Sequence, residues 1–75
     1  MPKLPILKAK EIEKILLKLG FVQTRQKGSH RFFLNKITGD TTVLPMHNKD
    51  IGRGLLRKII NDSGVGVKEF ISKKS

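Results

Sequence analysis

The spacing of the apolar residues changes at Gly20, and this change constrains the fold more than any other feature of the sequence. Before Gly20, an apolar stripe with spacings of i, i+3, i+4 and i+7 consists of Ile12, Ile15, Leu16 and Leu19. This stripe predicts an amphipathic helix that starts near Lys8 and ends at the glycine. After Gly20, apolar and polar residues alternate, as is typical of β-strands. The first predicted helix is therefore followed directly by a predicted sheet.

The alternating region divides into three short segments separated by turn residues. The segments predicted as strands are residues 21–26, 30–35 and 41–44, with turns at 27–29 and 38–40. In the middle strand, alternation puts His30, Phe32 and Leu34 on one face and Arg31 and Phe33 on the other. We expect both phenylalanines to pack against the rest of the protein rather than stack on nucleic-acid bases. The expected sheet is an antiparallel meander.

A second amphipathic segment follows the strands. Leu56, Ile59 and Ile60 indicate a helix over about residues 52–63 that Gly64 ends, and residues 67–73 can form one more short helix. The segments expected to be extended connections are residues 1–7 and 46–51.

This order of elements predicts an α+β fold in a single domain over residues 1–75. A three-stranded antiparallel sheet would carry the helices on one face and leave a polar face on the other. Double-stranded-RNA-binding domains have the same α-β-β-β-α order, although fold order alone does not carry function.

The net charge points to a polyanionic partner. Sixteen Lys and Arg residues against six Asp and Glu residues give a formal charge of +10. Nucleic acid is the usual partner of such a basic domain, and an acidic protein is the alternative. The chain has no Cys and no apolar run long enough to cross a membrane, so we expect a cytoplasmic protein without membrane contact.

A candidate site lies at the first predicted turn, where cations, a glycine and a histidine occur together. His30 carries an imidazole, a group whose ordinary pKa of about 6.5 lets it donate or accept a proton near neutral pH. Gly28 lets backbone N–H groups approach a phosphate closely. The cations expected to neutralise that phosphate are Arg25, Lys27 and Arg31. A strand-edge histidine can also have no catalytic role, so the residues alone leave both interpretations open.

His47 follows the third predicted strand and could be a second acid–base group. Antiparallel pairing would bring the end of this strand to the same side of the sheet as His30. A loop histidine that bonds its own backbone is an equally good interpretation. The carboxylates of Asp40, Asp50 and Asp62 stand too far apart in sequence to resemble a two-metal centre. We therefore expect chemistry that needs no metal and no cofactor.

Several short motifs occur in a consistent order along nearly the whole chain. They are Lys10-Glu11, Leu19-Gly20-Phe21, Gly28-Ser29-His30, Pro45-Met46-His47, Lys49-Asp50-Ile51, Gly54, Leu56-Arg57-Lys58-Ile59, Gly64 and Glu69-Phe70. In this order and spacing the sequence resembles the HicA-type (YcfA-like) mRNA interferase toxins of prokaryotic toxin–antitoxin modules.

This resemblance implies a double-stranded-RNA-binding-like fold and an RNA endonuclease. Members of the family cleave messenger RNA, arrest growth and are neutralised by a HicB-type antitoxin, which is expected to cover the histidine of the Gly-Ser-His motif. The histidine of this motif is the catalytic residue of the family, so the resemblance implies that His30 is catalytic here. The RNA-binding residues expected around it are Arg25, Lys27, Gly28, Ser29, Arg31, His47 and Lys49. A non-catalytic RNA-binding module with the same fold is the alternative.

Two positions depart from the family pattern. Gly54-Leu55-Leu56 stands where members often carry Gly-Thr-Leu, so a hydroxyl that could contact phosphate at the second helix is missing. Lys8 or Ala9 stands where a Ser usually precedes the first helix, and losing such a cap costs about 1 kcal/mol. Neither departure affects the Gly-Ser-His turn.

Overall fold

The computed structural model describes residues 4–46 and 50–74. Its elements, in chain order, are β1 (Leu7–Lys8), α1 (Ala9–Lys18), β2 (Phe21–Lys27), β3 (His30–Asn35), β4 (Thr41–Pro45), β5 (Asp50–Ile51), α2 (Arg53–Ser63) and α3 (Val67–Ser72). Within the described residues, no helix is long and apolar enough to cross a membrane.

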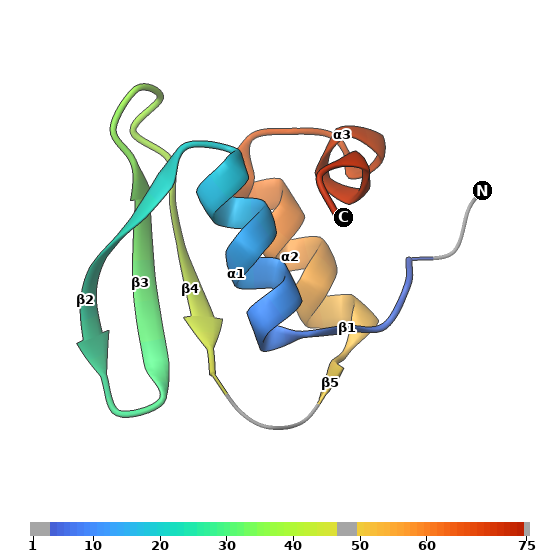
Figure 1. The fold of residues 1–75 in the computed structure, drawn as a ribbon, viewed down its shortest axis with the longest axis horizontal. Coiled ribbons are helices and arrows are strands. Elements are labelled where there is room, and N and C mark those ends of the chain that lie inside the picture. Colours follow the sequence, from blue (N-terminus) through green and yellow to red (C-terminus); the bar gives the residue numbers. More distant parts are fainter. Residues whose placement is uncertain (1–3, 47–49, 75) are drawn as a thin grey trace.

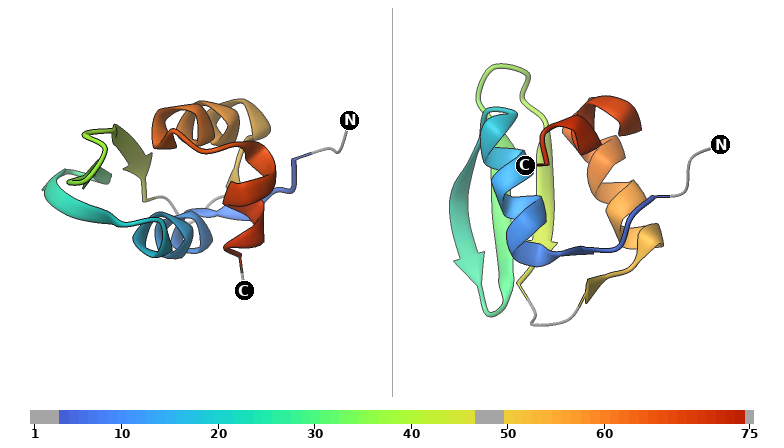
Figure 2. Two further views of the ribbon diagram at one scale, coloured as in Figure 1. Left: turned by 90° about the horizontal axis from the view of Figure 1, so that it is seen from above. Right: turned by 45° about the vertical axis from the view of Figure 1, so that its right-hand side comes forward.

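The main sheet is antiparallel, in the order β2-β3-β4, and the helices pack against one of its faces (Figures 1 and 2). Helix α1 lies alongside the sheet, and α2 lies next to α1 on the same side. Short turns join consecutive strands, so each strand pairs with its neighbour in sequence. The predicted α+β fold with α-β-β-β-α order is confirmed, and it is compatible with a double-stranded-RNA-binding-like arrangement.

A second, very short sheet joins the lead-in to the segment before α2. Leu7 pairs with Ile51 and Lys8 with Asp50, in antiparallel orientation. The prediction that both regions are merely extended connections missed this pairing. Strands of two residues are too short to show an alternating pattern, so only the fold brings them together.

The core lies between the sheet and the helices. The stripe residues Ile12, Ile15 and Leu16 of α1 are buried, and Leu19, which directly follows the helix, is partly exposed. They pack against Phe33 and Leu44 from the sheet and against the apolar faces of α2 and α3. The buried apolar residues are Leu4, Leu7, Ala9, Ile12, Ile15, Leu16, Phe21, Phe33, Leu44, Ile51, Leu56, Ile59, Ile60 and Phe70. Burial of these side chains is the main favourable contribution to folding.

Helix α1 begins without the expected serine, and its own first turn compensates. The Lys8 N–H donates to Glu11 Oε1 at 3.0 Å, which satisfies one backbone donor at the helix start. This hydrogen bond lowers the pKa of Glu11 below its ordinary value of 4.5, and the nearby Lys74 ammonium adds to the effect. Gly20 follows the helix with φ +99°, a left-handed conformation that favours glycine.

The face of the main sheet opposite the helices is less polar than predicted. Phe32, Leu34 and Val43 lie in its centre and are half-buried, and Val22 is exposed. Only Phe33 of the two phenylalanines belongs to the core. The expectation of a polar outer face is therefore wrong for the middle of the sheet, since three adjacent strands each contribute an apolar side chain there.

Candidate functional site

The Gly28-Ser29 turn joins β2 to β3 and sets the geometry of the candidate site. Lys27 and His30 flank the turn and are directly paired across the two strands. Gly28 has φ +60°, and a Cβ added there would meet nothing within 4 Å. The Gln26 side-chain Nε2 donates to the Gly28 carbonyl oxygen at 3.0 Å and holds the turn from one side. The site is therefore an exposed glycine turn with a cation and an imidazole at its two ends.

The end of β4 lies against this same turn. Pro45 pairs with His30, and the Met46 N–H donates to the Ser29 carbonyl oxygen at 2.6 Å. The prediction that the end of the third main strand returns to the His30 side of the sheet is thus correct as far as Met46. His47 and Lys49 lie outside the described residues.

A β-bulge in β2 decides which cations share the face of His30. Gln23 pairs with Phe33 and Arg25 pairs with Phe32, so Thr24 is the extra residue of the bulge. An extra residue shifts the alternation by one and turns the following side chains to the other face. Arg25 and Lys27 consequently lie on the outer face with His30. Without the bulge they would lie on the helix-covered face.

Arg31 lies on the opposite face of β3, away from the His30 side chain. Its Nη1 atom pairs with Glu13 Oε2 of α1 at 2.5 Å, and both side chains are partly buried. The structure therefore brings Arg25, Lys27, Gly28, Ser29 and His30 together and places Arg31 behind them. The sequence alone could not identify Glu13 as the partner of Arg31. It shows only an acidic residue near the start of a helix, and no local pattern links two residues that are 18 positions apart.

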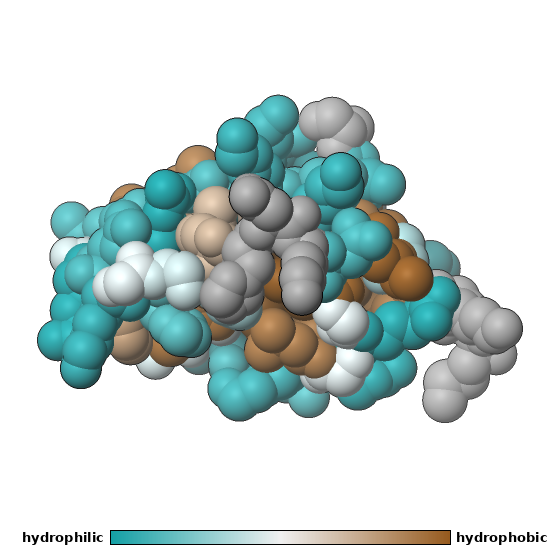
Figure 3. Space-filling view, turned by 90° about the horizontal axis from the view of Figure 1, so that it is seen from below, coloured by the Kyte–Doolittle hydropathy of each residue, from teal (hydrophilic) through white to brown (hydrophobic). Residues whose placement is uncertain are grey.

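The residues brought together are accessible to a large ligand. Arg25, Lys27, Gly28 and His30 are exposed, and Ser29 is partly exposed. In the view from below, hydrophilic residues cover the side of the molecule where this turn lies (Figure 3). An open, positively charged surface of this kind suits a polyanion with a regular phosphate spacing better than a small enclosed substrate.

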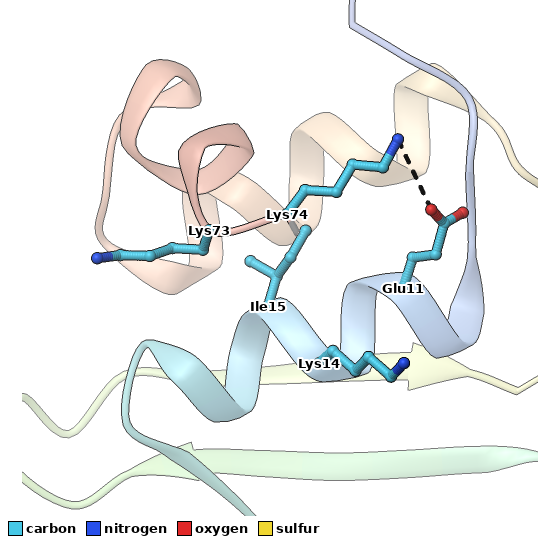
Figure 4. A pocket seen from close by; sticks show the side chains of 5 residues that line it. All are labelled: Glu11, Lys14, Ile15, Lys73 and Lys74. Atoms are coloured by element: carbon cyan, nitrogen blue, oxygen red, sulfur yellow. Dashed lines mark ion pairs between the residues drawn. The ribbon is translucent and has the colours of Figure 1, made fainter.

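The described residues contain no group of three His, Cys, Asp or Glu side chains placed to hold a metal ion. A cleft of about 230 Å³ lies elsewhere, between α1 and the end of α3. Its charged groups diverge: Lys73 and Lys14 extend away from each other, and Lys74 Nζ pairs with Glu11 Oε2 at 3.7 Å (Figure 4). Groups that diverge in this way do not form a binding site for one anion.

Comparison with known proteins agrees with the motifs and the fold. The family model for the HicA toxin of bacterial toxin–antitoxin systems matches residues 9–65, which include α1, the main sheet and α2. A search of curated proteins finds no match to the chain. Because the family model covers more than half of the 75 residues, this chain belongs to the HicA toxin family of bacterial toxin–antitoxin systems.

Proposed function

We propose that this HicA-family chain is a metal-independent messenger RNA endonuclease with His30 as its catalytic residue. The observation that supports this proposal best is the Lys27–His30 pair at an exposed glycine turn. It combines a proton-transfer group, a cation and an approachable backbone on one face, and each of these can assist the cleavage of an RNA phosphodiester.

The proposed reaction starts with attack of the neighbouring 2′-hydroxyl on the scissile phosphorus. His30 takes the proton of the attacking hydroxyl while water protonates the leaving 5′-oxygen, or His30 protonates that oxygen while water takes the hydroxyl proton. Imidazole suits both roles near neutral pH. The bond from phosphorus to the 5′-oxygen breaks as the bond to the 2′-oxygen forms. The products are a 2′,3′-cyclic phosphate and a 5′-hydroxyl.

The cations on the face of His30 hold and neutralise the phosphate in this proposal. Arg25 and Lys27 supply the charge, and the backbone at Gly28 and Ser29 supplies N–H donors. His47 and Lys49 lie outside the described residues and stay predicted RNA-binding residues. Arg31, predicted as a phosphate ligand, contributes instead by tying β3 to α1 through Glu13.

The family suggests the biological setting. As a toxin, the chain has an antitoxin partner, and we propose a HicB-type protein that covers His30 and the surrounding basic surface. Residues 1–75 then act as one RNA-cleaving domain in the cytoplasm, where messenger RNA is the substrate.

Substitution of His30 tests the catalytic assignment. His30→Ala and His30→Gln should abolish growth arrest when the chain is expressed alone, and should abolish cleavage of messenger RNA by the purified protein in EDTA. His47→Ala serves as the comparison for the second histidine of the chain. End analysis should find a 5′-hydroxyl on the downstream fragment, and a 5′-phosphate would exclude the proposed chemistry.

The same fold order could serve an RNA-binding module that does not cleave. In that case the purified chain binds RNA without cutting it, and the toxicity of the His30→Ala variant equals that of the original chain. Coexpression with a neighbouring gene product that relieves growth arrest would identify the antitoxin directly.

A further inference from the structure

Next to the candidate site, on the outer face of the main sheet, lies a second row of side chains that combines a cation with apolar groups. The strand register places Lys27, His30 and Pro45 in one row across the three strands. The next row on the same face consists of Arg25, Phe32 and Val43. The helices lie on the other side of the sheet, so both rows point away from the helices (Figure 2).

Arg25 and Phe32 form a stacked pair in the second row. The guanidinium carbon of Arg25 lies 4.5 Å from the centroid of the Phe32 ring, within the range of a cation–π contact. Phe32 is half-buried under Arg25, and Arg25 is itself exposed. The Thr24 hydroxyl donates to the Phe32 carbonyl oxygen at 3.2 Å, which fixes the bulge that turns Arg25 to this face.

The spacing between the two rows matches the size of one nucleotide. His30 and Phe32 are two residues apart on β3, which corresponds to about 7 Å along a strand. A phosphate held at Lys27 and His30 would therefore leave an adjoining base within reach of the Arg25–Phe32 pair. Single-stranded nucleic acids commonly bind sheet surfaces in this way, with a charged contact to the backbone and a planar group under the base.

We propose that the Arg25–Phe32 pair is a stacking platform for one unpaired nucleobase next to the scissile phosphate. The base lies on the outer plane of the Arg25 guanidinium, which Phe32 supports from below. Every base has a π-face, so the platform accepts all four bases and selects single-stranded over double-stranded RNA. This inference rests on the proposed function, because that function places the phosphate at His30.

The experiment combines protein variants with RNAs that lack one base. A short, labelled, single-stranded RNA is compared with versions that carry one abasic nucleotide at successive positions, and all proteins carry His30→Ala to keep the RNA intact. One abasic position should weaken binding about 5- to 150-fold, the range expected for one stacked base. Arg25→Lys keeps the charge but loses the plane, so it should weaken binding of the complete RNA similarly. With the RNA that lacks the stacked base, Arg25→Lys should reduce the affinity little or not at all, because the contact is already absent.

Phe32→Leu is the second variant and Arg57→Lys is the matched control, because Arg57 is exposed on α2. Thermal unfolding shows whether each variant is folded, and Arg25→Lys keeps the test valid if Phe32→Leu is not. The proposal is overturned if Arg25→Lys binds the complete RNA like its parent, or if its loss and the abasic loss simply multiply. It is also overturned if the substitutions weaken binding of the antitoxin and leave binding of the RNA unchanged.

The outcome is separable from that of the proposed function. If His30→Ala still cleaves RNA, the catalytic assignment fails, and the binding cycle is then measured with RNA that carries a 2′-deoxynucleotide at the cleaved position, so that the RNA stays intact and the cycle still tests the platform. If His30→Ala is inactive and the binding cycle shows no coupling, the catalytic assignment of His30 is supported and the stacking platform is excluded.

Discussion

Arg31 of β3 and Glu13 of α1 form an ion pair across the helix-covered face of the sheet, with Nη1 and Oε2 2.5 Å apart. Their side chains are only 30% and 22% exposed, so the pair is less screened by water than an ordinary surface pair. The pair joins the first helix to the strand that carries His30. The alternation of β3 turns Arg31 to the face opposite His30, and this ion pair holds the side chain on that face.

Glu13→Gln should lower the free energy of unfolding by about 1–2 kcal/mol, because Arg31 keeps its charge in a partly buried position and loses its charged partner. Urea denaturation measures the change. Glu69→Gln, at an exposed position of α3, is the control and should stay within about 0.5 kcal/mol of the original chain. Equal effects for the two variants would show that the Arg31–Glu13 pair contributes nothing to stability.

Gly64→Ala should destabilise the protein more than Gly39→Ala. Both glycines have positive φ, so each alanine costs about 1 kcal/mol of backbone strain. A Cβ at Gly64 would also come within 2.5 Å of Asp40 Oδ2, the oxygen that accepts a hydrogen bond from the Thr38 hydroxyl, whereas a Cβ at Gly39 meets nothing. Chemical denaturation of both variants measures the difference, which should be about 1 kcal/mol. Equal losses would mean that Asp40 moves aside freely.

Acid should weaken the start of α1 through Glu11. Because the folded pKa of Glu11 is lowered, its contribution is fully present above the ordinary value of 4.5 and is lost as pH falls through the lower folded value. The melting temperature of the original chain should therefore fall more steeply below about pH 4.5 than that of Glu11→Gln. Glutamine can still accept the Lys8 N–H but does not titrate. Parallel pH profiles of the two proteins would contradict this role.

Lys27→Ala should weaken RNA binding and reduce its salt dependence. Each phosphate contact to single-stranded nucleic acid contributes about 0.7 to the slope of log K against log salt, so the slope should fall by about that amount. The measurement uses the His30→Ala background, which keeps the RNA intact. Lys36→Ala is the control, because Lys36 is exposed just beyond the opposite end of β3. A change in slope for Lys36→Ala and none for Lys27→Ala would show that the RNA does not bind at the Gly28-Ser29 turn.

Much of the fold could be predicted because local patterns coincide with the structure. The stripe of α1 and the glycines that follow α1 and α2 depend on residues a few positions apart, so helix ends follow from the sequence. The turn at Gly28-Ser29 and the faces of β3 follow in the same way. The pairing of β1 with β5 could not be predicted, since two-residue strands carry no period.

By itself, the sequence determined the order of elements, the basic charge and the position of His30 at a glycine turn, because these depend on local spacing and composition. Only the tertiary structure decided which cations join His30. The extra residue Thr24 reverses the alternation of β2, and its effect depends on pairing with β3. Alternation already places Arg31 on the face opposite His30, and the tertiary structure adds its partner there, Glu13 of α1, which lies 18 residues away in sequence. Alternation thus specifies the faces of a regular strand such as β3, whereas the faces of the bulged strand β2 depend on its pairing with β3.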